Sequence, residues 1–202
     1  VQPGDIKMAD INNDHVISSE DRTFIGNPHP KLTYGVNIDL EFKQFDLSIF
    51  GQGVYGNDVF MATIYYLESG IGYWNTLTTM SDYWQEEGDN TAVPKLGLSA
   101  QDKNMRMSER YVKDGSFFRI KNLQLGYTLP AKLTERIGIE KFRIYVNGQN
   151  LLSFHDYKGF DPEIGTGRSG GTADQRAVLD IGIDRGMYPL SRIITAGVNL
   201  TF

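Results

Sequence analysis

Residues 32–42 read LTYGVNIDLEF and, after Lys43 and Gln44, residues 45–49 read FDLSI. Apolar side chains occupy every second position of both stretches, and the positions between them are polar or glycine. Because successive side chains of a β-strand point to opposite faces, this alternation predicts two strands, each with one apolar and one polar face. The two residues between them predict a tight hairpin, and we expect the second strand to end between residues 51 and 56.

Three further stretches show the same alternation. Residues 117–129 place Leu123, Leu125 and Tyr127 on one face, whereas Phe118 and Ile120 have the opposite parity. This change of parity predicts a bulge or the end of the regular strand. Residues 142–154 and 191–202 predict a fourth and a fifth strand.

The connections between these strands differ greatly in length. Residues 43–44 and 131–140 are short connections, the second with about one helical turn expected, whereas residues 55–115 and 155–190 are long and without sustained periodicity. So long a loop argues against a compact soluble domain. Short turns at one end and long loops at the other are typical of a transmembrane β-barrel.

Composition excludes several classes of protein. The 202 residues carry a formal net charge of -5, which gives no electrostatic basis for binding nucleic acid. Cysteine is absent, so neither disulfides nor thiolate metal sites nor a cysteine nucleophile can form. No segment approaches the roughly 18 apolar residues of a transmembrane helix.

Residues 10–21 read DINNDHVISSED and place oxygen-bearing groups at the spacing of an EF-hand calcium loop. Hard oxygen ligands at alternate positions suit Ca²⁺, and Ile17 would anchor the loop to a core. The sequence therefore predicts a structural calcium ion. Its ligands would be Asp10, Asn12, Asp14, the carbonyl of Val16, Ser18 and Asp21.

Two positions depart from that pattern. His15 stands where calcium loops use glycine in a left-handed conformation, and Asp21 is shorter than the usual glutamate. The alternative is a turn rich in aspartate and asparagine that is satisfied by its own backbone and holds no metal.

Other candidate chemistry is weak. The histidines His15, His29 and His155 lack the spacing of a zinc site. The pairs Glu86–Glu87 and Asp161–Glu163 are interpreted as solvated loop charges, and the glycines of residues 165–171 lack the strand and helix of a phosphate-binding loop. We therefore expect no enzymatic activity.

Aromatic residues gather in the first long loop and on the strands. Contact with a ligand or partner is predicted for Tyr73, Trp74, Asp82, Tyr83 and Trp84, because aromatic faces pack against sugar rings and peptides. Packing within the loop is the alternative. Tyr34 and Tyr127 are expected to lie at a membrane interface.

Several motifs, in order along the chain, resemble a known family. They are PGDIKMADINNDHVISSEDRTFIGNPHPKLTYGVN (residues 3–37), GSFFRIKNLQLGYTLP (115–130), IYVNGQNLLSF (144–154), YKGFDPE (157–163) and GMYPLSRIITAGVNLTF (186–202). Together they resemble the C-terminal part of the SusC/RagA family, the TonB-linked outer-membrane transporters of Bacteroidota.

This resemblance implies an all-β fold, namely about five C-terminal strands of a large antiparallel transmembrane β-barrel with long extracellular loops. Residues 1–31 would be an extracellular loop with the EF-hand-like motif, and residues 32–202 barrel strands and loops. Five strands cannot close a barrel, and an open edge in hydrocarbon leaves backbone groups unpaired. The segment would therefore be completed by the N-terminal part of the same transporter, which carries the plug and the contact with TonB.

The resemblance also implies an importer of glycans or peptides in the bacterial outer membrane, surrounded by lipid and capped by a SusD/RagB-type surface lipoprotein. Phe202 would complete a terminal assembly signal; the alternative is an ordinary amphipathic strand that ends in phenylalanine. Polar side chains such as Asn37, Asp39, Glu41 and Gln124 would line a wet interior. Two other functions stay open: a secreted soluble β-sandwich that binds carbohydrate and holds a structural calcium, and an inert surface fragment.

Overall fold

A computed structural model describes residues 2–68, 75–96, 104, 106–134, 138–164 and 180–202. Contacts between α-carbons divide the chain into two units. One comprises residues 1–28, 58–113 and 164–187, and the other residues 29–57, 114–163 and 188–202. Each unit is described by itself below.

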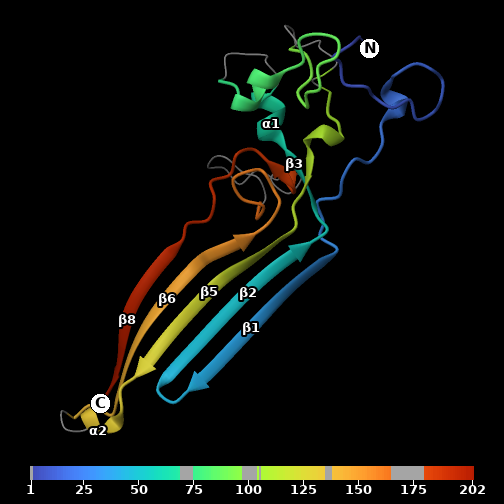
Figure 1. Ribbon diagram of the computed structural model, residues 1–202. Helices are drawn as coiled ribbons and strands as arrows, with labels where there is room; N and C mark the ends of the chain where they lie inside the picture. Colours follow the sequence, from blue (N-terminus) through green and yellow to red (C-terminus); the bar gives the residue numbers. More distant parts are fainter. Residues whose placement is uncertain (1, 69–74, 97–103, 105, 135–137, 165–179) are drawn as a thin grey trace, which may run out of the picture. The chain divides into compact units, whose positions relative to one another are not determined.

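The second unit is built on a five-stranded sheet in the order β1-β2-β5-β6-β8 (Figure 1). Every neighbouring pair in it is antiparallel. The strands are β1 (Leu32–Phe42), β2 (Phe45–Tyr55), β5 (Phe117–Thr128), β6 (Lys141–Phe154) and β8 (Ile193–Thr201). All five predicted strands are confirmed, with ends within two residues of those expected.

The short connections join the strands as the sequence predicts. Phe42 pairs with Phe45, so Lys43 and Gln44 form a two-residue hairpin loop, in which Lys43 has a φ of 56°. A left-handed first residue is the geometry that matches the twist of a two-residue hairpin. Between β5 and β6 lies the single-turn helix α2 (Ala131–Thr134), which confirms the expected helical turn.

Register aligns the two faces of all five strands. One transverse row contains only apolar residues: Leu40, Leu47, Leu125, Val146 and Ala196. The adjacent row points to the other face and contains only polar residues: Asp39, Ser48, Gln124, Asn147 and Thr195. Because of this pairing, the apolar sides of the five strands form one continuous apolar face of the sheet, and their polar sides form the opposite, polar face.

The apolar face has no second layer of protein on it. Val36, Leu125 and Val198 are 45%, 49% and 53% exposed. A β-sandwich buries these positions between two sheets. The alternative of a soluble sandwich is therefore wrong, since in the part of the chain that the structure describes nothing covers this face.

An irregularity in β5 confirms the predicted bulge. Between Ile120 and Asn122 the pairing of β5 shifts: Lys121 is an additional residue relative to β2, whereas β6 has two residues, Asn150 and Leu151, in the same interval. On β6, Asn150 adopts a φ of 52° at the same level. The bulge restores Phe118 and Ile120 to the apolar face, which explains their opposite parity in the sequence.

Aromatic rings lie at both ends of the apolar face. Toward the long loops, Tyr34 and Phe118 stack with ring centroids 6.0 Å apart, and Phe118 and Phe154 lie at 6.4 Å. Near the hairpin, Phe45 and Tyr127 are 4.8 Å apart. Aliphatic side chains occupy the band between these two groups of rings.

The first unit contains short elements. They are η1 (Ser19–Asp21), β3 (Asp58–Met61), α1 (Ala62–Leu67), η2 (Thr78–Asp82), η4 (Glu109–Tyr111) and β7 (Ile183–Asp184), and β4 (Val112–Asp114) lies at its boundary. A three-stranded sheet has the order β4-β3-β7, with β3 and β7 parallel. Val59, Met61, Met80, Val93 and Tyr111 are buried here. The stretch expected to be loop thus has a small core of its own, formed by elements too short to show a period.

No helix in the described part of the chain is long and apolar enough to cross a bilayer.

Candidate functional site

The calcium-type loop of residues 10–21 is held by its own side chains. Asp10 Oδ2 accepts a hydrogen bond from the amide of His15 at 2.8 Å. Asn12 Oδ1 accepts from the amide of Asp14 at 3.1 Å, and Asp14 Oδ1 accepts from the amide of Val16 at 2.8 Å. The side chains of Asp10, Asn12 and Asp14 therefore point into the loop and stabilise its turn by hydrogen bonds to its own backbone amides.

Asp21 joins the two ends of this loop. Its Oδ2 accepts from the amide of Ser18 at 2.7 Å, and its Oδ1 accepts from the amide of Ile11 at 2.9 Å. The hydrogen bonds from Ser18 and then from Ile11 lower the pKa of Asp21 below its ordinary value. Ser18 Oγ in turn accepts from the amide of Glu20, and η1 begins there with a capping box.

The backbone adopts the conformation that the motif requires. His15 has a φ of 65° and Asn13 a φ of 61°, both left-handed. Calcium loops use glycine at the position of His15 because that residue must be left-handed. The loop therefore bends as a calcium loop does despite the histidine, whereas Ile17, which we expected to anchor it, is only half-buried.

One oxygen inside this loop has no partner. Asp10 Oδ1 is buried and makes no hydrogen bond. An unsatisfied carboxylate oxygen at the first ligand position is consistent with a hard cation. No group of three or more His, Cys, Asp or Glu side chains in the described segments could hold a metal, so the acidic side chains of this loop do not form a ligand set by themselves.

The predicted aromatic contact site is only partly described. Tyr73 and Trp74 lie outside the described residues. Trp84 packs closely on Gly4, since a β-carbon there would lie 2.3 Å from the indole ring. Asp82 and Tyr83 line a hollow of about 540 Å³, whose other residues are Gln85, Glu86, Asp89, Asn90 and Thr91.

A buried ion cluster was not predicted. Arg119 on β5 donates to Asp161 Oδ1 at 2.5 Å, and the two side chains are only 4% and 7% exposed. Lys121 Nζ donates to both oxygens of Glu163 at 2.6 Å, and Arg119 Nη1 lies 3.1 Å from Glu163 Oε2. The interpretation of Asp161–Glu163 as solvated charge is wrong, because this pair fixes residues 157–163 against the cations of β5.

Asp161 is strongly held in its charged form. Its Oδ2 accepts from the amide of Leu190 at 3.1 Å, and its Oδ1 also accepts from the amide of Glu163 at 2.9 Å. Burial raises the pKa of Asp161, but the bonds from Arg119, Glu163 and Leu190 outweigh it, so the pKa is lowered. The signal available in the sequence was the pair of cations Arg119 and Lys121 on β5, the second of them at the bulge.

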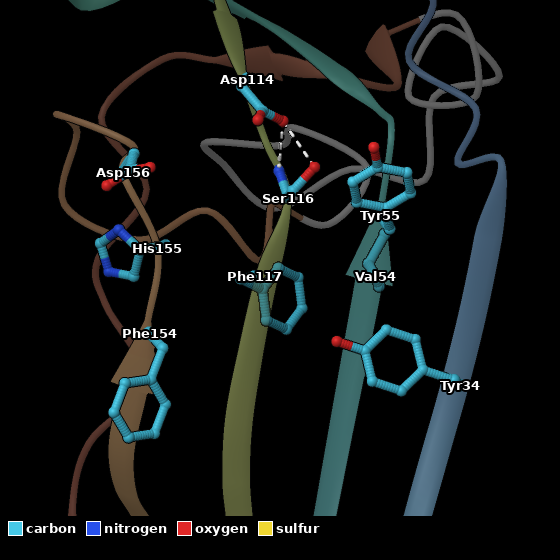
Figure 2. Close-up of a pocket in the computed structure, with 9 residues that line it drawn as sticks. All are labelled: Tyr34, Val54, Tyr55, Asp114, Ser116, Phe117, Phe154, His155 and Asp156. Carbon is cyan, nitrogen blue, oxygen red and sulfur yellow. Dashed lines mark hydrogen bonds between the residues drawn. The ribbon is translucent and has the colours of Figure 1, made fainter.

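A second hollow, of about 380 Å³, lies at the end of the five-stranded sheet nearest the long loops (Figure 2). Its lining combines aromatic rings with carboxylate groups. Its lining residues are Tyr34, Val54, Tyr55, Asp114, Ser116, Phe117, Phe154, His155 and Asp156.

The terminal Phe202 follows β8 directly and is 83% exposed. Its role as an assembly signal stays a prediction.

The fold and these loops define a class: a segment of an outer-membrane β-barrel. No family model matches the chain. The TonB-dependent receptor P3 of Formosa agariphila is 40% identical over 200 residues, which cover 99% of this chain and 19% of that protein. The TonB-dependent receptor SusC of Bacteroides thetaiotaomicron is 24% identical, over 100% of this chain and 18% of that protein.

A solved structure of the RagAB peptide transporter matches 87% of this chain and 17% of its own, with a TM-score of 0.69 and 30% identity. The chain thus spans about a fifth of the length of its relatives. It belongs to the SusC/RagA-type TonB-dependent receptors, as a C-terminal segment of the larger protein. TonB-dependent receptors such as SusC and RagA are outer-membrane proteins.

Proposed function

We propose that this segment forms part of the wall of a TonB-dependent importer of glycans or peptides, whose apolar face contacts outer-membrane lipid and whose polar face lines the bore. The observation that carries the proposal is the exposed apolar face in register with a polar face across five strands. From Tyr34 to Phe42 the strand rises about 26 Å. Tilted by roughly 40°, it would cross about 20 Å, close to the roughly 25 Å apolar band of such barrels.

The whole importer would also contain the N-terminal part of the same protein, with the plug and the TonB contact, and a SusD/RagB-type lipoprotein lid. The relation to SusC and to RagAB supports this assembly. Aromatic side chains of the first long loop, among them Tyr83, would contact the ligand or the lid.

The experiment is purification of the full-length receptor from native outer membranes through an affinity tag. Bound peptides and oligosaccharides are then released by denaturation and identified by mass spectrometry. We expect a lipoprotein in equal molar amount and retained oligosaccharides or peptides. A receptor that carries neither, from cells grown on mixed glycans and protein digest, would contradict the proposal.

We further propose that residues 10–21 bind one structural Ca²⁺ through Asp10, Asn12, Asp14, Val16, Ser18 and Asp21. The unpartnered Asp10 Oδ1 and the left-handed His15 support this site. The ion would replace several of the loop's own hydrogen bonds and rigidify the approach to β1.

For this site, the full-length receptor is titrated with Tb³⁺, and luminescence and the competing Ca²⁺ concentration are recorded. Asp10→Asn should weaken Ca²⁺ binding at least tenfold, because it removes charge from the first ligand position. The exposed Glu87 offers a matched control, since Glu87→Gln removes the same charge outside the loop. Absence of binding at millimolar Ca²⁺ would leave the metal-free turn as the correct interpretation.

A further inference from the structure

Phe50 of β2 lies on the polar face of the five-stranded sheet. It pairs with Asn37 of β1 and with Asn122 of β5, and each of the three is two residues along its strand from a member of the polar row that contains Ser48. Phe50 is 39% exposed. This ring therefore belongs to the face that lines the bore, and lipid contact does not account for it.

The positions that surround Phe50 on this face are polar or glycine. Directly opposite residues of neighbouring strands lie about 5 Å apart, and residues two positions along one strand about 7 Å apart. Among these strand positions, all of which the structure describes, no apolar side chain is adjacent to the ring. The surrounding residues are Asn37 and Asn122 beside it, Ser48 and Gln52 along β2, and Gly35, Asp39, Arg119 and Gln124 on the diagonals.

Gly35 leaves room for the ring to lie along the sheet. A β-carbon at Gly35 would lie 3.5 Å from Cε2 and 3.9 Å from Cζ of Phe50, which is van der Waals contact. Beside the ring, Asn37 Nδ2 donates to Asp39 Oδ2 at 2.5 Å, and both side chains are exposed. A flat ring bordered by amide groups is complementary to a sugar, because the ring packs against the C–H face of the sugar while the amides bind its hydroxyl groups.

The cations near Phe50 are already paired. Arg119 Nη2 lies 2.5 Å from Asp161 Oδ1, and Lys121 Nζ lies 2.6 Å from Glu163 Oε1. These two ion pairs leave amide and hydroxyl groups as the main hydrogen-bonding partners around the ring. An uncharged ligand with many hydroxyl groups is complementary to such a surface, whereas an anionic glycan would find both of these cations occupied.

We propose that Phe50, Asn37, Asn122 and Gln124 form a subsite on the bore wall for one sugar of a neutral oligosaccharide, which stacks on the Phe50 ring. A protein segment would bring a cluster of apolar side chains to the centre of its interface, and no adjacent position on this face supplies Phe50 with an apolar neighbour to meet one. The inference rests on the proposed function and specifies its substrate class.

Native mass spectrometry of the full-length receptor in detergent tests the subsite. The probes are neutral hexasaccharides of glucose, mannose, xylose and galactose, a hexamer of galacturonic acid, and a tryptic digest of casein. We expect at least one neutral hexasaccharide to be retained in preference to the acidic hexamer and the peptides. Retention of no neutral hexasaccharide, or stronger retention of the acidic hexamer or the peptides, would overturn the proposal.

Substitutions at Phe50 separate stacking from simple packing. Phe50→Leu should lower retention of the neutral hexasaccharide about fivefold, because it keeps an apolar side chain but removes the flat ring, and Phe50→Trp should retain the sugar at least as well as the parent. Asn37→Ala should lower retention about threefold, through the loss of one hydrogen bond. Unchanged retention in Phe50→Leu, or weaker retention in Phe50→Trp than in Phe50→Leu, would contradict a stacking role.

Phe42→Leu is the matched control. Phe42 is an exposed ring at the hairpin end of β1, on the apolar face. The same substitution there removes a ring outside the bore, so it should leave retention of the sugar unchanged.

Access to the ring is tested with Phe50→Cys in energised cells, with the parent receptor as the background. We expect labelling by a water-soluble maleimide that the neutral hexasaccharide slows. Absence of labelling would show that the plug or another part of the protein covers this position, and would overturn the proposal.

Failure of this subsite is distinguishable from failure of the proposed function. A receptor that is purified with bound peptides and binds no neutral hexasaccharide remains an importer and loses only the subsite. A receptor that carries neither a ligand nor a lipoprotein contradicts the proposed function itself.

Discussion

The buried ion cluster on β5 gives the sharpest quantitative prediction. In Arg119→Met, Asp161 would keep its bonds from the amides of Glu163 and Leu190 but lose its cation at 2.5 Å, while remaining only 7% exposed. Removing one partner of a buried ion pair costs about 3–5 kcal/mol, because the remaining charge has no compensation. Lys121 still neutralises Glu163 in this variant, so the lower end of that range, about 3 kcal/mol, applies.

Hydrogen exchange in the full-length receptor measures this cost locally. About 3 kcal/mol corresponds to an increase of roughly a hundredfold in the exchange rate of the amides of Glu163 and Leu190, if these open by releasing residues 157–163. Protection of the ladder between β5 and β6 should not change, because its bonds do not involve the cluster. Exchange at Glu163 and Leu190 within about threefold of the parent would refute the idea that the cluster holds this segment.

Three more predictions follow from particular residues. The pKa of Asp161 is lowered in the folded state, so its stabilising contribution is present above its ordinary pKa of 3.8 and is lost as the pH falls through the lower pKa of the folded state. The hydrogen-exchange rate of the Leu190 amide, corrected for its intrinsic rate, should therefore stay constant from pH 7 to 5 and rise only below about pH 4. His15→Gly should slow hydrogen exchange of the loop's own amides about fivefold, since it removes a left-handed cost of about 1 kcal/mol that the loop bears without metal, and unchanged exchange at the amide of Val16 would contradict this. Gly53→Leu should displace the Tyr34 ring, which lies 2.2 Å from the position of a β-carbon at Gly53, and lower the melting temperature of the detergent-solubilised receptor; an unchanged melting temperature would mean that the ring has room to move.

The strands and their faces could be predicted from the sequence because a two-residue period is a local signal. The alternation in residues 32–42 and the change of parity at Phe118 and Ile120 together gave the sheet and its bulge. Pairing then followed from antiparallel order, with the tight hairpin at Lys43 and Gln44. The family motifs added the order of the strands in a larger barrel.

Contacts between distant residues could not be predicted in the same way. Arg119 and Asp161 are 42 positions apart, and nothing local marks Asp161 as buried rather than solvated. The core around Val59 and Tyr111 was missed for a similar reason, since β3 and α1 are too short to show a period. The calcium-type loop of residues 10–21 is an intermediate case. Its left-handed turn could be predicted from the spacing of the oxygen-bearing residues, whereas binding of Ca²⁺ depends also on the concentration of the ion.

Site-specific labelling across the sheet tests the central claim, that the apolar face contacts lipid and the polar face contacts water. The segment contains no cysteine, so Leu125→Cys and Gln124→Cys introduce adjacent positions on opposite faces. In outer-membrane vesicles carrying the full-length receptor, a fluorophore at position 125 should be quenched by a lipid-bound quencher and resist a water-soluble one, and position 124 should show the reverse. Aqueous quenching at position 125, or the same response at both positions, would contradict the account.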